Sequence, residues 1–296
     1  MLIESQEYTL LESENFKVIK QTVSLPLCDL HYMKVGSGPP LIIVPATMSE
    51  LDDWAGLAQF MAQRFTVFFF ELPGHGKSTP LAHYSNQQVA QVVVDLLDYL
   101  KFDRVSLMGF SFGGLLALTA LNLLSPRVDR VILISPLIDS KALRFPQLNK
   151  VLLRSLISVA QRPGLQQWGH QTLQSDLGST FWAQFAVKVG NIEHFDILKA
   201  NLRATSLPTI QTLAGQMREI FSTHQFAAAR YPHPCYFAMS VIDPLIDFSF
   251  TSAAVKQMFS SVEEIRLNLP YHRPRVLPTL EYLNQTYPDL LDKIGV

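Results

Sequence analysis

The alternation of apolar and polar residues predicts strands of two kinds. From Phe16 to Val35 the two classes alternate in two runs separated by Pro26, the pattern of an antiparallel pair with one buried face at the edge of a sheet. The run Leu41 to Val44, after a glycine- and proline-rich turn, is apolar throughout, as in a strand covered on both faces. Further runs of this second kind are Phe65 to Phe70, Val105 to Met108 and Val131 to Ile134.

Helical patterns separate these apolar runs. Apolar residues recur at helical spacing over Trp54 to Gln63, Gln87 to Leu100 and Phe112 to Leu124. Regular alternation of strand and helix predicts an α/β protein with a mostly parallel sheet wrapped by helices. The alternation returns near the C-terminus, in strands and helices near Cys235 to Val241, Ala253 to Phe259, Glu264 to Leu269 and Leu277 to Gln285.

The alternation is interrupted over residues 137–230, which contain helical segments rich in Leu, Phe, Trp and Gln. We therefore expect an inserted helical cap at 137–230 and one core domain built from 1–136 and 231–296. Large apolar residues of the insertion, among them Trp168, Phe181 and Trp182, favour an apolar acyl or aromatic small molecule as substrate.

Composition excludes several other classes of function. Of the 296 residues, 48% are hydrophobic and 17% charged, and 24 Lys and Arg balance 25 Asp and Glu. This composition argues against disorder and against a basic surface for nucleic acid. No apolar stretch is long enough for a membrane span, and the acidic segment Met1 to Phe16 lacks the pattern of a secretory signal, so we expect a cytoplasmic protein.

Neither a metal nor a cofactor is indicated. Cys28 and Cys235 form no paired motif, and the histidines show no ligand spacing. Gly76, Lys77 and Ser78 resemble the end of a phosphate loop, but Glu71 stands where that loop requires glycine. The sequence carries no indication of the oligomeric state.

The most informative motif is Gly109-Phe110-Ser111-Phe112-Gly113, which follows a buried strand and opens an apolar helix. In this context Gly-x-Ser-x-Gly predicts a serine presented on a strained turn between strand and helix. A serine hydroxyl is a weak nucleophile at neutral pH and requires an imidazole base that a carboxylate orients.

With this motif, with the turn Glu71 to Ser78 and with the insertion after the sixth strand, the chain resembles the α/β-hydrolase family from about Leu30 to Leu290. The resemblance implies an eight-stranded sheet and a catalytic triad in the chain order nucleophile, acid, histidine. It disfavours epoxide hydrolase and dehalogenase chemistry, which uses a carboxylate where Ser111 stands.

His272 and Asp243 are the expected partners of Ser111. Each follows a predicted strand at the carboxyl edge of the sheet, and their separation in sequence leaves room for one helix and one strand. Asp247 and Asp139 stay open as alternative acids. His75 lies in a Gly-His-Gly turn, and we expect it to have no role as a base.

The resemblance also implies an oxyanion hole made of backbone donors. The family commonly places His-Gly after its third strand, where this chain has Pro45 and Ala46. The expected donors are the N–H groups of Thr47 and Phe112, and Ala46 must adopt a negative φ.

These features favour a serine hydrolase that cleaves an ester, thioester or related carbonyl bond through an acyl-enzyme. Two alternatives stay open. One is a hydrolase of carbon–carbon bonds on the same fold. The other is a ligand-binding protein without catalytic activity, which the altered Pro45-Ala46 loop suggests.

Overall fold

The structure is a computed structural model that describes residues 16–47, 49–145, 155, 157–159, 162–190, 195–224, 226, 231–273 and 278–294. Most of the acidic N-terminal segment, residues 1–15, lies outside the described residues. The chain divides into two compact units, one of residues 1–146 with 222–296 and one of residues 147–221.

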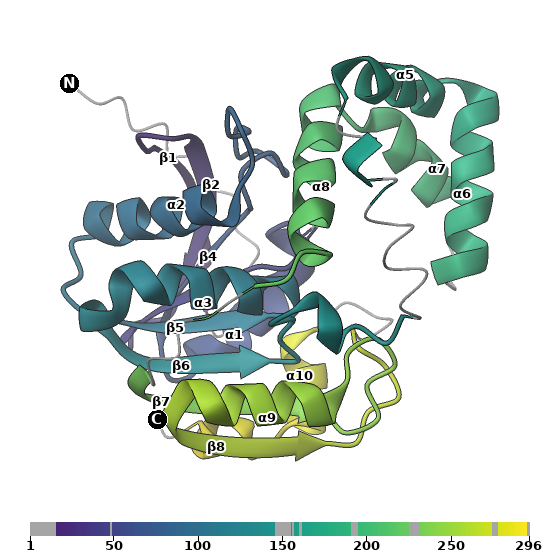
Figure 1. Cartoon of the computed structure of the whole chain (residues 1–296). Coiled ribbons are helices and arrows are strands. Elements are labelled where there is room, and N and C mark those ends of the chain that lie inside the picture. The colour runs from purple at the N-terminus through teal and green to yellow at the C-terminus, as the bar shows by residue number, and fades with distance from the viewer. Residues whose placement is uncertain are drawn as a thin grey trace, which may run out of the picture. The chain divides into compact units, whose positions relative to one another are not determined.

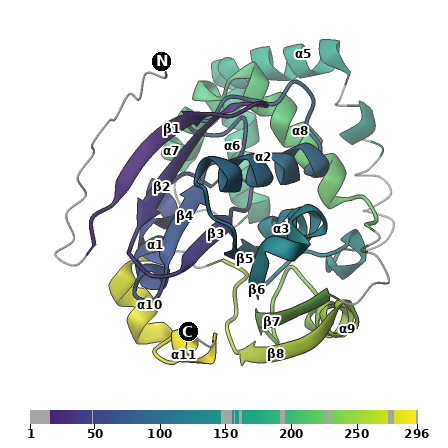
Figure 2. The same cartoon turned by 90° about the vertical axis from the view of Figure 1, so that its left-hand side faces the viewer.

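A single eight-stranded sheet, in the order β1-β2-β4-β3-β5-β6-β7-β8, forms the first unit. β2 is antiparallel to both β1 and β4, and all other pairs are parallel. The predicted fold class is therefore confirmed, with the alternating pair at one edge (Figure 2). The strands are β1 (Ile19–Ser24), β2 (Asp29–Val35), β3 (Pro40–Val44), β4 (Thr66–Phe70), β5 (Val105–Phe110), β6 (Val128–Ile134), β7 (Tyr231–Ser240) and β8 (Phe259–Leu267).

Helices cover both faces of this sheet. One face carries α1 (Ala55–Ala62), α10 (Leu280–Thr286) and α11 (Leu290–Lys293), and the other carries α2 (Asn86–Tyr99), α3 (Phe112–Leu124) and α9 (Phe248–Met258) (Figures 1 and 2). Short 3-10 helices η1 (Asp52–Trp54), η2 (Ser125–Arg127) and η3 (Ser140–Ala142) lie in the connections.

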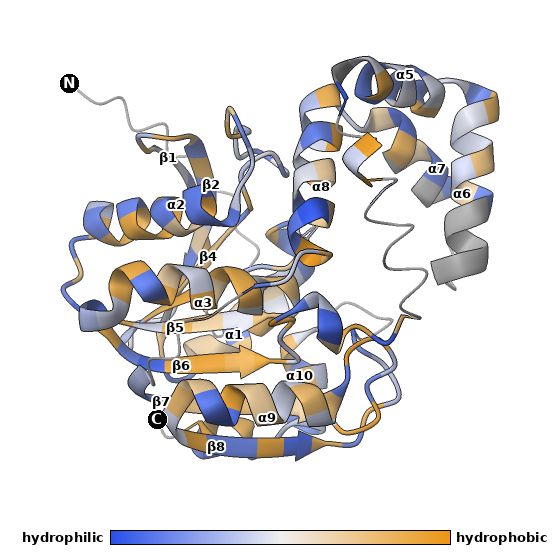
Figure 3. Ribbon diagram, viewed as in Figure 1, coloured by the Kyte–Doolittle hydropathy of each residue, from blue (hydrophilic) through white to orange (hydrophobic). Residues whose placement is uncertain are grey.

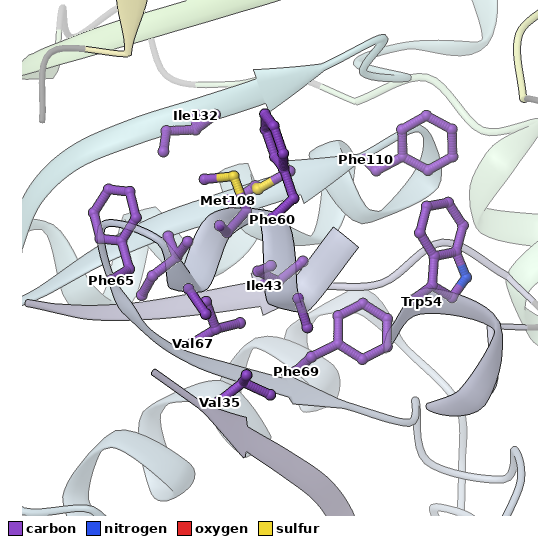
Figure 4. Packing of buried hydrophobic residues seen from close by; sticks show 14 of the residues in the cluster. Val35, Ile43, Trp54, Phe60, Phe65, Val67, Phe69, Met108, Phe110 and Ile132 are labelled. Carbon is purple, nitrogen blue, oxygen red and sulfur yellow. The ribbon is translucent and has the colours of Figure 1, made fainter. Parts of the chain in front are cut away.

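Burial explains the two strand patterns read from the sequence. β4 and β5 are buried at every position, as expected for central strands covered on both faces. β8 lies at the edge, and Figure 3 shows it mostly hydrophilic whereas β6 is hydrophobic over most of its length. The aromatic and aliphatic cluster on the α1 face includes Trp54 between Phe69 and Phe110 (Figure 4).

Capping residues set helix boundaries that periodicity alone misplaced. The helix expected near Ala253 to Phe259 begins at Phe248, because the Asp247 carboxylate accepts a hydrogen bond from Phe250 N at 2.8 Å. Thr279 caps α10 in the same way, so that helix begins at Leu280.

The second unit contains four described helices. They are α5 (Pro163–Gln174), α6 (Asp176–Gly190), α7 (Phe195–Ala204) and α8 (Leu207–Ile220). Ser206 caps α8 and Pro208 occupies its first turn, where proline is favourable. Within the described parts of both units, no helix combines the length and apolar character needed to cross a bilayer.

Candidate active site

Ser111 occupies a strained backbone position between β5 and α3. Its φ of 53° and ψ of −121° lie outside the regions that side-chain-bearing residues favour, at a cost of roughly 1–3 kcal/mol. Three backbone hydrogen bonds hold the turn: Ser111 N donates to Ile134 O at 3.1 Å, and Ser111 O accepts from Gly114 N and Leu137 N at 2.9 and 2.8 Å. The turn therefore presents the hydroxyl at the carboxyl edge of the sheet.

Close packing explains the glycines around Ser111. A Cβ at Gly113 would overlap the carbonyl oxygen of Val44 at the end of β3, and one at Gly109 would overlap Gly113 O. A Cβ at Gly114 would press against Pro136. The absence of side chains at these positions lets α3 begin directly against the sheet.

The structure brings His272 between Ser111 and Asp243. His272 Nε2 lies 2.8 Å from Ser111 Oγ, and Nδ1 lies 2.7 Å from Asp243 Oδ2. Because an ionised carboxylate only accepts, Nδ1 carries the proton in this arrangement and Nε2 is free to accept from the serine hydroxyl. This is the geometry that base-assisted nucleophilic attack requires.

Asp243 is fully buried and is held by backbone donors. Its Oδ1 accepts from Leu245 N at 2.8 Å and Ile246 N at 2.9 Å, which leaves Oδ2 for His272. Burial alone raises the pKa of this carboxyl, but the hydrogen bond and charge of His272, with the two N–H donors, hold the pKa below its usual range. The carboxylate is therefore ionised at neutral pH.

Aromatic contacts hold the imidazole and the residue that follows it. The His272 ring stacks on Phe110 with centroids 5.5 Å apart, and Phe110 packs on Trp54 at 5.2 Å. The Arg273 guanidinium lies 5.2 Å from the Trp54 ring centroid, and an Arg273 nitrogen lies 3.5 Å from a carboxylate oxygen of Asp53. The charge of Arg273 is thus directed to an aromatic face and an anion.

The two expected oxyanion donors follow β3 and open α3. Phe112 N lies in the first turn of α3, where an N–H group has no acceptor within the helix. Thr47 lies in the loop after β3, and Ala46 has a negative φ, since the described non-glycine residues with positive φ are Lys101, Ser111 and Ser135.

The side chain of Glu71 holds the loop after β3 in place. Its buried carboxylate accepts from Leu51 N at 3.3 Å and from Lys77 N at 2.6 Å, and so joins the loop after β3 to the turn after β4. Burial raises the pKa of Glu71, and the two backbone hydrogen bonds oppose this rise. Gly76, with φ of 51°, leaves the space that the carboxylate fills.

Asp247 and Asp139, the two alternative acids, and the histidine His75 have other roles in the structure. Asp247 is the N-cap of α9, and Asp139 caps η3 and accepts from His224 N at 3.0 Å. His75 lies in the turn after β4, where its backbone N–H donates to Leu72 O at 2.9 Å. An aspartate directly before a helix is the sequence signal for the capping roles of Asp247 and Asp139.

Sequence reasoning missed two features at this edge. Ser135, directly after β6, has a φ of 41°, and no motif marks it. Tyr271, adjacent to His272, has its hydroxyl 2.6 Å from that of Tyr282 on α10. Across the described ranges, no group of three or more His, Cys, Asp or Glu residues is arranged to hold a metal ion.

Comparison with known proteins identifies the fold. A family model described as alpha/beta hydrolase fold matches residues 39–220, more than half of the chain. A thermophilic esterase from Thermogutta terrifontis superposes with a TM-score of 0.65 over 93% of this chain and 100% of its own, and at 17% identity this likeness concerns the fold alone.

Curated relatives match over shorter stretches. An uncharacterized protein of Mycobacterium tuberculosis (strain ATCC 25618 / H37Rv) is 39% identical over 101 residues, which are 34% of this chain and 30% of that protein. The pimeloyl-(acyl-carrier protein) methyl ester esterase of Nitrosomonas europaea is 29% identical over 109 residues, 37% of this chain and 42% of the esterase. The chain thus matches less than half the length of either relative.

Proposed function

Because the chain belongs to the alpha/beta hydrolase fold family, we propose that it is a serine hydrolase acting on an ester or thioester bond of an apolar small molecule. The observation that carries this proposal is the position of His272, within hydrogen-bond distance of both Ser111 Oγ and Asp243 Oδ2. A buried carboxylate, an imidazole and a hydroxyl in this order form the arrangement used for acyl transfer.

In the first half of the proposed reaction, Ser111 Oγ attacks the carbonyl carbon of the substrate. His272 Nε2 accepts the hydroxyl proton as the bond forms, and Asp243 stabilises the imidazolium. The imidazolium then gives that proton to the leaving alcohol or thiol as the carbon–oxygen or carbon–sulfur bond breaks. The product of this half is an acyl-Ser111 ester.

In the second half, His272 takes a proton from water, whose oxygen attacks the acyl carbon. Ser111 Oγ leaves and recovers a proton from the imidazolium, and the carboxylic acid is released. In both halves the negative oxygen forms next to Phe112 N and Thr47 N, which we assign as the oxyanion donors. Loss of one such donor costs about 10² to 10³ in rate in enzymes of this kind.

The nucleophile argues against epoxide hydrolysis, the activity in the names of some relatives. That chemistry requires a carboxylate where this chain has Ser111. A neutral hydroxyl assisted by His272 suits an electrophilic carbonyl carbon instead. The helical segment 137–230 is proposed to be a cap that contributes to substrate binding.

A panel of para-nitrophenyl esters of rising chain length, assayed with wild type and Ser111→Ala, tests this function. We expect turnover by wild type and a loss of at least about 10³ in kcat/KM in the variant. Cleavage of a vinylogous diketone without ester turnover would instead favour a carbon–carbon hydrolase. Saturable ligand binding without turnover of either substrate class would favour a non-catalytic protein.

A further inference from the structure

An apolar cavity of about 90 Å³ lies in the first unit, between the sheet and helices α1, α10 and α11. Its wall includes Met61 of α1, Phe110 of β5 and Ala238 of β7, together with the imidazole of His272. Phe60, Met108 and Phe110 from this wall are seen together in Figure 4. The cavity therefore begins at the base that the proposed reaction uses and extends into the hydrophobic core.

Most polar groups in the wall already have partners. Ser240 Oγ bonds to Leu269, and the hydroxyl of Tyr271 bonds to that of Tyr282. A ligand in the deep part of the cavity would thus meet few polar atoms in need of a hydrogen bond. Such a surface binds hydrocarbon and disfavours a sugar or a phosphate.

Ser135 and Trp54 are the exceptions in this wall. Ser135 is 6% exposed and adopts a φ of 41° directly after β6, and among the described residues its hydroxyl has no hydrogen-bond partner. Trp54 Nε1 is buried and also has no partner among the described residues. A buried N–H without a partner is costly, and backbone strain like that at Ser135 is concentrated at functional sites. Ser135 and Trp54 therefore indicate a polar atom of a ligand in the cavity that they share with His272.

We propose that this cavity holds the hydrocarbon chain of the substrate, with the Ser135 hydroxyl hydrogen-bonded to an oxygen near the bond to be cleaved. This inference rests on the proposed hydrolase function. A space of about 90 Å³ has room for about six water-sized groups, and hence for a chain of about four to six carbon atoms. The chain belongs either to the acyl group or to the leaving alcohol.

Two variants change the cavity in opposite directions. Ala238→Val fills part of it from β7, and Met61→Ala enlarges it from α1; both residues are buried and neither has a role in the proposed chemistry. Ala90→Val on α2, a buried alanine outside the cavity wall, is the matched control for crowding of the core.

The effect of these variants is measured as the dependence of kcat/KM on chain length in two series of esters. The first series is para-nitrophenyl esters from acetate to octanoate, and the second is acetates of primary alcohols from methanol to octanol. The effect should appear in the series whose variable chain enters the cavity. In that series, Ala238→Val should lower kcat/KM for the six-carbon chain by about tenfold relative to the shortest ester, and Met61→Ala should move the optimum to longer chains. Unchanged profiles in both series, with activity on the shortest ester retained, would overturn the proposal.

Binding to Ser111→Ala separates this inference from the proposed function. Trp54 lines the cavity, so 1-hexanol should change the tryptophan fluorescence of Ser111→Ala saturably, and this change should be lost in the double variants that add Trp54→Phe or Ala238→Val but persist with Ala90→Val. Ser135→Ala should weaken 1-hexanol binding by about fivefold to tenfold. Absence of saturable binding would contradict the cavity proposal even where Ser111-dependent turnover is found, and binding without turnover would contradict only the hydrolase function.

Discussion

The hydroxyl of Ser240 forms two hydrogen bonds with the backbone of Leu269, donating to its carbonyl at 2.7 Å and accepting from its N–H at 3.0 Å. Ser240 ends β7, three residues before Asp243, and Leu269 lies three residues before His272. One buried side chain therefore ties the loop of the acid to the loop of the histidine. Ile242 N also donates to this hydroxyl, at 3.3 Å.

Ser240→Ala should lower kcat by roughly tenfold with little change in KM, because the two loops lose their common anchor and the imidazole is placed less accurately. The variant also leaves the Leu269 N–H unsatisfied, so we expect it to lose about 1–3 kcal/mol of unfolding free energy. Ester kinetics and urea denaturation measure the two effects. Ser260→Ala, which removes a hydroxyl bonded to Tyr231 O at the other end of the same strand pair, should leave kcat unchanged.

Asp243→Asn should reduce kcat by on the order of 10⁴ while preserving the fold. Leu245 N and Ile246 N both donate to Oδ1, so the amide oxygen of asparagine will occupy that position and its NH₂ group will face His272. The imidazole must then accept at Nδ1 and carry its proton on Nε2, which faces Ser111 and can no longer act as a base. Near-wild-type kcat in a folded variant would exclude Asp243 as the orienting acid.

Gly113→Ala should destabilise the protein by several kcal/mol, because the new methyl group would overlap the carbonyl oxygen of Val44. Gly169 in α5 is the matched control, since a Cβ there meets no atom within 4 Å. Gly169→Ala should stabilise the helix by about 0.5–1 kcal/mol. Thermal unfolding of the two variants should shift in opposite directions, and equal shifts would contradict the packing described at this turn.

Glu264 should make the free energy of unfolding depend on pH in the acid range. Partial burial raises the pKa of this carboxyl, but hydrogen bonds from Lys256, Ser252 and Arg266 outweigh it and lower the pKa to about 2. Because the folded state binds this proton less tightly than the unfolded state, the stabilisation is complete above the ordinary pKa of 4.5 and is lost as the pH falls towards 2.

Urea denaturation of wild type and Glu264→Gln measures this contribution. We expect the variant to be less stable at pH 7 by on the order of 1–3 kcal/mol, and the difference to shrink as the pH falls below 4.5. Glu263→Gln is the control, since Glu263 is exposed and makes no ion pair with the described residues. If the difference in unfolding free energy between wild type and Glu264→Gln stays constant down to pH 2.5, the lowered pKa of Glu264 is not its cause.

The fold could be predicted because its signals are local. Buried parallel strands give continuous apolar runs, and the predicted helix Phe112 to Leu124 coincides with α3. Helix starts were less accurate because capping by Asp247 and Thr279 adds residues that the apolar period does not mark.

The site could be predicted only in part. Ser111 is marked by its motif, and spacing selected the histidine and the acid that the structure places beside it. The strain at Ser135, the Tyr271–Tyr282 contact and the cavity could not be predicted, since each depends on side chains from distant segments and on the volume left between them. The roles of the three residues, the Thr47 and Phe112 donors, and the cap at 137–230 stay predictions.

Covalent labelling with a fluorophosphonate tests most directly whether Ser111 is an activated nucleophile. We expect one adduct per chain, located by peptide mass spectrometry on Ser111, absent from Ser111→Ala and formed at least about a hundredfold more slowly in His272→Gln. Equal labelling of Ser111→Ala, an adduct on another residue, or an undiminished rate without the imidazole would contradict this expectation.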